Sequence, residues 1–249
     1  MMTMTPIDEV QAISRAEAVA LAAAENRRMV ELLRQLGDDD WTKATDCPEW
    51  DVRAMAGHVV GMMATFASLK EFAHVMRAAP KAAGDGPRVD GMTAVQVADR
   101  AHLSTAELIE QAAEIGPRSA RGRGRVPALL RKAPMKEEVG GETETWKLGY
   151  LLDVILTRDP WMHRVDLSRA TGREMVLTAD HDGRLIADVV AEWARRHGQP
   201  FTLHLTGPAG GTFTNGVGGD EITLDAVEFC RTLSGRATGA GLLTQEVPF

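Results

Sequence analysis

Three side chains in two predicted helices have the types and spacing of a divalent-metal site. Asp159 and His163 are four residues apart, so on one helix they lie about 6 Å from each other and can share an ion. His58 lies between Met55 and Met62 on an apolar helix face, which directs its ring to the interior. Buried acids and imidazoles are costly without a strong partner, and a divalent metal would supply that partner.

Spacing alone leaves other interpretations open. A lone histidine such as His58 on an apolar face is more often a satisfied core residue than a metal ligand. Asp159-Pro160 also fits a helix N-cap followed by proline at the first helical position, which would begin a new helix there. His163 and Asp166 would then be an ordinary surface pair.

The elements that carry these residues are predicted to be helices of one bundle. Apolar residues recur at helical spacing over about residues 6–36, 52–79, 92–115 and 145–170, with caps or breakers at the ends. The inward stripe of the fourth helix comprises Leu148, Leu152 and Ile155, followed by Asp159, His163 and Asp166. Residues 116–141 are rich in glycine, proline and basic side chains and are predicted to be a long irregular crossover. Four helices with one long connection are typical of a four-helix bundle.

The pattern changes after residue 171, which indicates a second, smaller domain. Residues 172–177 are predicted to be a linker, 182–197 a helix, and 201–206 and 221–224 short strands. Asp225 would cap a last helix that ends near Ser234-Gly235. We therefore predict an α+β protein with a bundle domain at 1–171 and a small α+β domain at 178–249.

Composition narrows the classes of function. The chain has 249 residues and a formal net charge of −7, which argues against a protein that coats nucleic acid or acidic membranes. No apolar stretch approaches the roughly 20 residues that span a bilayer, and no signal peptide is recognisable. The two cysteines, Cys47 and Cys230, are too few for a disulfide framework, and both are expected to be structural. The cytoplasm is the expected location.

Three runs of residues make the chain resemble a known family. They are Trp41-x5-Cys47-Pro-Glu-Trp50-Asp-Val-Arg-x4-His58, Arg158-Asp-x3-His163-Arg-x-Asp166, and the tail motifs Asp220-Glu-Ile-Thr-Leu and Leu233-Ser-Gly-Arg236-Ala-Thr-Gly-x-Gly-Leu. In this order and spacing they resemble the mycothiol-dependent maleylpyruvate isomerase-like proteins, part of the DinB-like superfamily of metal-binding four-helix bundles. The resemblance covers nearly the whole chain.

The resemblance implies a divalent metal, usually zinc, held by His58, Asp159 and His163. Where the characterised isomerase has a glutamate, this chain has the shorter Asp159. Three protein ligands would leave a position open, as in a catalytic site. The resemblance further implies mycothiol as a thiol cofactor, which would lose its proton on the metal. The metal-bound thiolate would then be the nucleophile of an isomerase or S-transferase that acts on a small electrophilic substrate.

The resemblance also suggests roles for two further residues. Arg236 would hold a substrate carboxylate, although a cation favoured by a helix-end dipole is the alternative. Asp166 would orient His163, or would be a surface capping partner. Two other functions remain open at this point: a non-catalytic metal- or ligand-binding module, for which Asp166 is the candidate fourth ligand, and a thiol-independent metallohydrolase.

Overall fold

The structure is a computed structural model of the chain, and it describes residues 4–249. It divides into two compact units. The first comprises Arg15–Arg131 and Asp159–Met175, and the second comprises the residues up to Ser14, Lys132–Arg158 and Val176–Phe249. Within the described range, no helix is long and apolar enough to cross a lipid bilayer.

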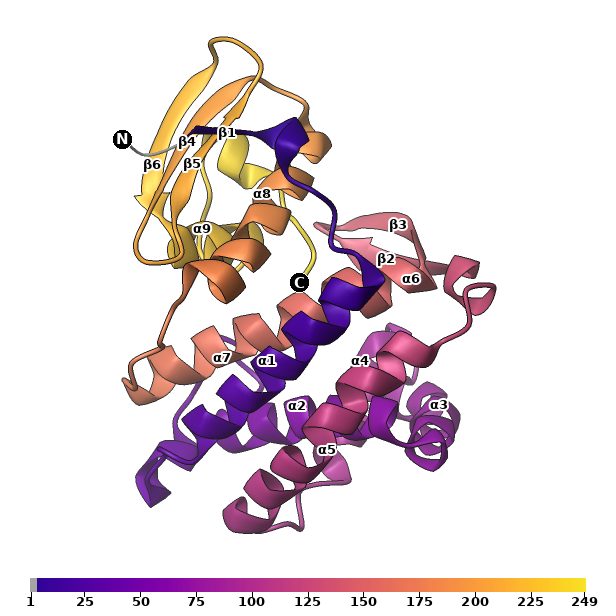
Figure 1. Cartoon of the computed structure of the whole chain (residues 1–249). Coiled ribbons are helices and arrows are strands. Elements are labelled where there is room, and N and C mark those ends of the chain that lie inside the picture. Colours follow the sequence, from indigo (N-terminus) through magenta and orange to yellow (C-terminus); the bar gives the residue numbers. More distant parts are fainter. Residues whose placement is uncertain (1–3) are drawn as a thin grey trace. The chain divides into compact units, whose positions relative to one another are not determined.

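The first unit is a helical bundle (Figure 1). Its long helices are α1 (Arg15–Leu33), α2 (Val52–Ala67), α5 (Thr105–Arg125) and the larger part of α7 (Leu156–Thr171). A pair of shorter helices, α3 (Leu69–Ala83) and α4 (Arg88–Ala98), packs on α2. The buried core of the bundle draws on all four long helices and includes Met29, Leu33, Met55, Val59, Leu108, Ala112 and Leu167.

Two predicted helices are each divided in the structure. The helix predicted over 52–79 breaks at Ser68, whose backbone is extended (φ −143°, ψ 127°) and whose hydroxyl oxygen caps α3 by accepting a bond from the Glu71 amide. The helix predicted over 92–115 is interrupted before Ser104, where α5 begins. Ser104 and Glu107 form a reciprocal capping box. Local hydrogen bonding by serine therefore ended helices that apolar periodicity alone would have continued.

The predicted irregular crossover is wrong for its first part, because α5 continues through Pro117 to Arg125. Tertiary contacts support this glycine-rich end of the helix. The amide of Asn26 donates to the carbonyl of Gly116 at 2.9 Å, and a Cβ at Gly122 would clash with the carbonyl of Phe66. At the C-terminal end, Arg15 donates to the carbonyls of Gly124 and Val126, which are among those that a helix end leaves unpaired. Close packing thus overrides low helix propensity.

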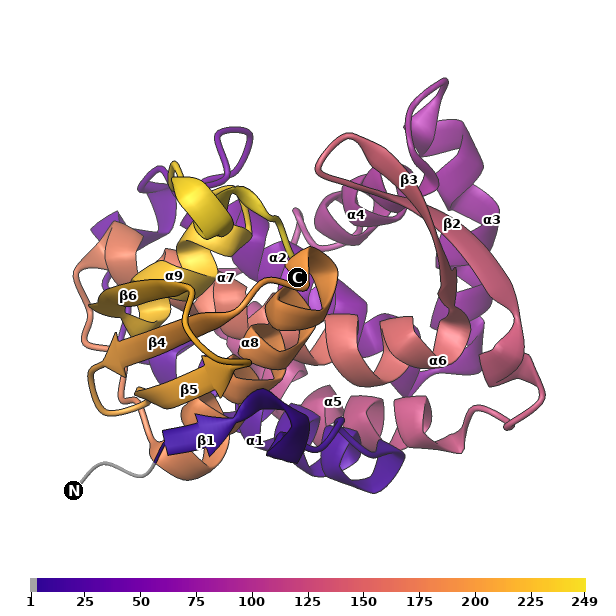
Figure 2. The same cartoon turned by 90° about the horizontal axis from the view of Figure 1, so that it is seen from above.

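The second unit contains a four-stranded sheet with the order β1-β5-β4-β6, seen from above in Figure 2. The strands are β1 (Met4–Pro6), β4 (Phe201–Thr206), β5 (Gly211–Asn215) and β6 (Asp220–Asp225). β4 pairs antiparallel with β5 and parallel with β6, and β1 pairs parallel with β5. Two helices, α8 (Arg184–His197) and α9 (Ala226–Leu233), contact each other. Trp193 packs against Phe201 and Phe229 with ring centroids 4.8 and 5.4 Å away.

These observations confirm the predicted fold class, a four-helix bundle with a smaller α/β part, and the predicted strands 201–206 and 221–224. Asp225 caps α9 as predicted, by accepting bonds from the amides of Val227 and Glu228. The first residues differ from prediction: α1 begins at Arg15 rather than near Pro6, because β1 adds to the sheet. The residues up to Ser14 and Lys132–Arg158 cluster with the second unit, although they lie within the bundle domain predicted at 1–171.

Residues 134–147 form a hairpin where a crossover and the start of a helix were predicted. β2 (Pro134–Val139) pairs antiparallel with β3 (Glu142–Lys147). Gly140 and Gly141 form the turn with φ of 57° and 82°, the positive values that a tight two-residue hairpin turn needs. The Val-Gly-Gly-Glu run was the available signal for this turn.

The chain leaves β3 through α6 (Leu148–Tyr150) and a π-helical turn, Leu151–Ile155, before α7 begins. Arg158, in the first turn of α7, is 1% exposed and is held by Asp188 and Glu192 of α8 at 2.5 and 2.8 Å. The Tyr150 hydroxyl donates to Glu192 at 2.6 Å. This buried ion network fixes the start of α7 immediately before Asp159.

Candidate metal centre

His58 is positioned by α2, a helix whose residues are mostly buried. Asp51 begins α2 by accepting a bond from the Ala54 amide at 2.7 Å, as an aspartate N-cap does. Two turns later His58 is 8% exposed, between the fully buried Met55 and Val59. The apolar stripe therefore turns this imidazole inward, as predicted.

Asp159 and His163 lie one turn apart on α7, at 22% and 6% side-chain exposure. Asp159 is inside the helix, which begins at Leu156, so the interpretation of Asp159-Pro160 as a helix start is wrong. The π-helical turn at Leu151–Ile155 comes directly before this segment, and Leu156 departs from helical geometry with ψ of 0°. Such a local change of helical pitch accommodates the backbone donor that Pro160 lacks.

The three side chains converge from the two helices. Asp159 Oδ1 lies 3.3 Å from Nε2 of His163, and Asp159 Oδ2 lies 3.7 Å from Nε2 of His58. The centroids of the two imidazole rings are 5.1 Å apart, and the rings meet edge to face. One ligand atom from each of the three residues lies within 4.8 Å of the others. One carboxylate is therefore shared between two imidazoles, which is the donor set that divalent zinc binds.

Asp166 contacts the opposite edge of the His163 ring. Its Oδ2 is 3.1 Å from Nδ1 of His163, and the aspartate is fully buried. A carboxylate at this distance accepts the Nδ1 proton, which leaves the lone pair of a neutral ring on Nε2, toward Asp159. Asp166 therefore lies where it can set the tautomer and the orientation of His163.

Trp50 adds an aromatic wall beside the two imidazoles. Its ring centroid lies 5.0 Å from that of His58 and 5.8 Å from that of His163. The signal was present in the sequence, since Trp50 directly precedes the N-cap of the helix that carries His58. An apolar ring against both imidazoles limits their rotation and excludes water from one side.

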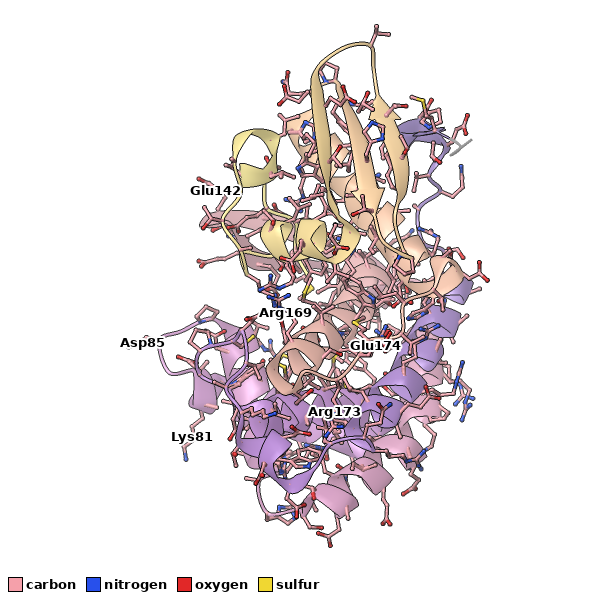
Figure 3. The ribbon with its side chains drawn as sticks, turned by 90° about the vertical axis from the view of Figure 1, so that its left-hand side faces the viewer. Lys81, Asp85, Glu142, Arg169, Arg173 and Glu174 are labelled. Atoms are coloured by element: carbon pink, nitrogen blue, oxygen red, sulfur yellow. The ribbon has the colours of Figure 1, made fainter. Side chains whose placement is uncertain are left out.

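The loop that carries Trp50 is anchored to α7 and to the residues after it. Asp46 pairs with Arg169 of α7 at 3.5 Å, and Asp40 pairs with Arg173 at 2.8 Å. Figure 3 labels Arg169 and Arg173, which follow the metal-ligand candidates along the chain. The Thr45 hydroxyl donates to the carbonyl of Trp50 at 2.8 Å and closes the loop on itself.

The electrostatics of the centre are those of a coupled acid–imidazole pair. Burial alone would lower the pKa of His163, but the carboxylates of Asp159 and Asp166 outweigh it and raise this pKa to about 9. Burial would raise the pKa of Asp159, but His163 and His58 hold it well below its usual range. Without a metal, therefore, the pair is a carboxylate and an imidazolium at neutral pH.

Two buried polar atoms of the centre test whether a metal would fit. Within residues 4–249, neither Nδ1 of His58 nor Oδ2 of Asp159 has a hydrogen-bond partner. Buried polar atoms without partners are rare and call for an explanation. A cation bound by Asp159 Oδ2 would satisfy this oxygen and replace the long contact with His58, so the residues present fit a divalent metal.

Comparison with known proteins places the chain in a family. A family model described as the mycothiol maleylpyruvate isomerase N-terminal domain matches residues 22–168. That match spans more than half of the chain and includes His58, Asp159 and His163. The chain belongs to this family.

Solved structures of the mycothiol maleylpyruvate isomerase family share the fold of the whole chain. Crystal structures of the mycothiol-dependent maleylpyruvate isomerase and of a mutant of it each superpose with a TM-score of 0.55. In each case the sequences are 17% identical, and the alignment covers 98% of both chains. No curated protein matches the sequence.

Arg236, the remaining predicted site residue of this family member, belongs to the second unit. It lines a hollow of about 400 Å³ together with Thr232, Thr238, Thr244 and Glu246. The tight turn at Gly235, with φ of 77°, precedes it after α9. Three threonine hydroxyl groups and the Glu246 carboxylate give this hollow a mainly polar lining, to which Leu243 adds an apolar side chain. The role of Arg236 toward a substrate stays a prediction.

Proposed function

We propose that this chain is a metal-dependent enzyme that uses mycothiol to isomerise a small electrophilic substrate or to transfer a thiol to it. The single observation that carries the proposal is the convergence of His58, Asp159 and His163 within 4.8 Å. Family membership supports it, because the matched domain is named after the mycothiol maleylpyruvate isomerase. Zinc is the expected metal, since nitrogen and carboxylate donors suit it.

The donor set favours an open coordination position. Asp166, the candidate fourth ligand, is engaged at Nδ1 of His163, on the opposite edge of the ring from Asp159. The three donors therefore leave room for a small ligand, as in catalytic sites. Zinc held there would lower the pKa of a thiol brought to the open position and so supply a thiolate at neutral pH.

The chain's own residues have three tasks in this proposal. Asp166 keeps the Nδ1 proton of His163 in place, so that Nε2 is the ligand atom. Trp50 and the buried face of α2 keep water from one side of the centre. Arg236 binds a substrate carboxylate, for which a guanidinium offers two parallel donors. The expected setting is the cytoplasm, where low-molecular-weight thiols are kept reduced.

The test combines metal analysis with turnover. Elemental analysis of the purified protein is expected to find a divalent metal, which His58→Ala removes. The matched control His74→Ala should retain the metal, because His74 is a partly exposed histidine paired with Asp99 at 2.8 Å. Turnover of maleylpyruvate and of other small electrophiles is then measured with and without mycothiol.

Each outcome of this test assigns a function. Metal together with mycothiol-dependent turnover supports the proposal. Metal with hydrolysis that ignores mycothiol indicates a metallohydrolase, and metal without any turnover indicates a binding module. A protein that binds no metal, and in which His58→Ala changes neither stability nor ligand binding, would overturn all three functions.

A further inference from the structure

A second group of metal-binding side chains lies beside the proposed centre. One ligand atom each of Cys47, His163 and Asp166 lies within 4.8 Å of the others. Asp166 is fully buried, His163 is 5% exposed and Cys47 is half-buried. Asp166 contacts Nδ1 of His163, whereas Nε2 faces Asp159, so Asp166 gives this second group access to the Nδ1 edge of the shared ring.

The backbone of Cys47 is held in place on both sides. Its amide donates to the Thr45 hydroxyl at 3.2 Å, and its carbonyl accepts from the Thr45 hydroxyl at 3.2 Å and from the Trp50 amide at 2.9 Å. The side chain is therefore presented to His163 by a closed loop. Neither this cysteine nor Cys230 is in a disulfide within the described residues, so Cys47 carries a thiol, the group that binds metals as a thiolate.

We infer that Cys47, His163 and Asp166 form a second site for a thiophilic divalent cation, which fills when metal is in excess. A thiolate, an imidazole and a carboxylate suit zinc, cadmium and cobalt. Zinc bonds are about 2.0–2.3 Å long, so adjustments of about an ångström bring these atoms to one ion. The ion replaces the Cys47 thiol proton and the Nδ1 proton of His163, and both protons pass to solvent.

Occupation of this site has a consequence for the proposed function, with which it shares His163. The ion draws Asp166 away from the imidazole that it orients. With ions on both nitrogens, the ring bridges two cations that repel each other, so the second ion binds more weakly than the first. Excess metal is therefore expected to inhibit the enzyme, and Cys47→Ser is expected to relieve that inhibition.

Cobalt titration of the apo protein tests the inference directly. Wild-type protein is expected to bind two equivalents, the second with a thiolate-to-cobalt charge-transfer absorption in the near ultraviolet. Cys47→Ser should bind one equivalent and lack this absorption, whereas His58→Ala should bind one equivalent and keep it. Cys230→Ser is the matched control and should behave as wild type, because Cys230 is fully buried and belongs to the other unit.

The outcomes separate the second site from the first. Wild-type protein that saturates at one equivalent without the charge-transfer absorption, even at large cobalt excess, overturns the Cys47 site and leaves the proposed function intact. The same applies if the absorption persists in Cys47→Ser. An absorption that Cys47→Ser removes and His58→Ala does not, in a protein that binds one equivalent only, supports the Cys47 site and counts against the His58 ligand set. If a variant fails to fold, the presence or absence of the charge-transfer absorption in wild-type protein still tests whether a cysteine binds the second ion.

Discussion

Each nitrogen of the His163 ring contacts a carboxylate, so substitution of either carboxylate should alter how His163 binds a metal. Asp159 lies at Nε2 and the fully buried Asp166 at Nδ1. We expect Asp166→Asn to lower zinc affinity about 10- to 100-fold, because groups that orient a ligand histidine contribute that much. Competition with a chromophoric chelator measures the affinity.

The control for this change is Asp85→Asn, since Asp85 is an exposed residue after the end of α3 (Figure 3). It should leave zinc affinity unchanged. Equal affinities for Asp166→Asn and wild type would show that Asp166 does not act on the metal through His163. Unfolding curves of both variants establish that any loss is local.

Protonation of His163 predicts how metal uptake depends on pH. Its pKa in the apo protein is raised to about 9 by Asp159 and Asp166, against the opposing effect of burial. The ion pair therefore stabilises the apo fold below the unfolded pKa of about 6.5, and this contribution is lost as the pH rises through 9. Because a ligand nitrogen must be unprotonated, zinc affinity should rise from pH 6 to pH 9.

Calorimetry in buffers of different ionisation enthalpy checks this prediction. At neutral pH, binding of one zinc ion should release about one proton from His163, so the apparent enthalpy should vary with the buffer. An enthalpy that is the same in all buffers would mean that His163 is already neutral in the apo protein, contrary to the raised pKa.

Among the helices, α1 and α7 are joined by a buried, bidentate ion pair. Arg164 donates from Nε and Nη2 to the two carboxylate oxygens of Glu25 at 2.6 and 3.0 Å. Glu25 is 0% exposed and Arg164 is 3% exposed. Removing one partner leaves a buried charge, so Arg164→Ala should lower the free energy of unfolding by about 3–5 kcal/mol.

Denaturant unfolding of three variants tests that expectation. Replacing both partners by apolar residues (Glu25→Leu with Arg164→Met) should cost less than Arg164→Ala alone, because no charge is stranded. Arg118→Ala breaks an exposed pair with Glu114 on α5 and should cost less than about 1 kcal/mol. If Arg118→Ala and Arg164→Ala lower the free energy of unfolding equally, burial does not make the Glu25–Arg164 pair more stabilising than an exposed pair.

Helix α5 approaches the end of α2 so closely that one position has no room for a side chain. A Cβ at Gly122 would clash with the carbonyl of Phe66. We expect Gly122→Ala to destabilise the bundle by about 1–3 kcal/mol through overpacking, in spite of the better helix propensity of alanine. At Gly57, in α2, the nearest atom to a Cβ would be a side-chain nitrogen of Arg53 at 3.5 Å, so Gly57→Ala should be neutral or stabilising. Thermal unfolding compares the two variants. An equal change in their unfolding temperatures would contradict the role given to close packing at Gly122.

At the same scale, sequence reasoning succeeded where a residue's effect is local. The inward faces of α2 and α7 follow from periodicity, and the helix begun by Asp225 follows from its cap. It failed where a distant contact decides. Glycine occurs at position 122 of α5 because a side chain there would clash with the carbonyl of Phe66. Strand β1 forms because β5 lies beside it in the sheet. The convergence of His58 with Asp159 could be predicted only as one of several possibilities, since spacing says nothing of how two helices are packed.

For the whole molecule, the distribution of the proposed metal ligands predicts which unit zinc should stabilise. His58, Asp159 and His163 all belong to the bundle unit, which is built from two separate stretches of chain. Zinc at 100 times its dissociation constant should stabilise the folded form by about 2.7 kcal/mol. Scanning calorimetry should therefore show a higher unfolding temperature of the bundle with zinc, and no shift in His58→Ala. A shift that survives in His58→Ala would place the stabilising metal elsewhere.

The two units alternate along the chain, and this has a consequence for synthesis on the ribosome. The bundle lacks α7 until residues 159–175 have been made, and β1 waits for β5, at Gly211–Asn215, before its edge is paired. His58 emerges about 100 residues ahead of its two partners, so a nascent chain cannot close the tridentate centre early. All three proposed ligands are therefore present only after residue 163 of the 249 has been made, and a ribosome that stalls before residue 159 releases a product in which His58 is the only one of the three.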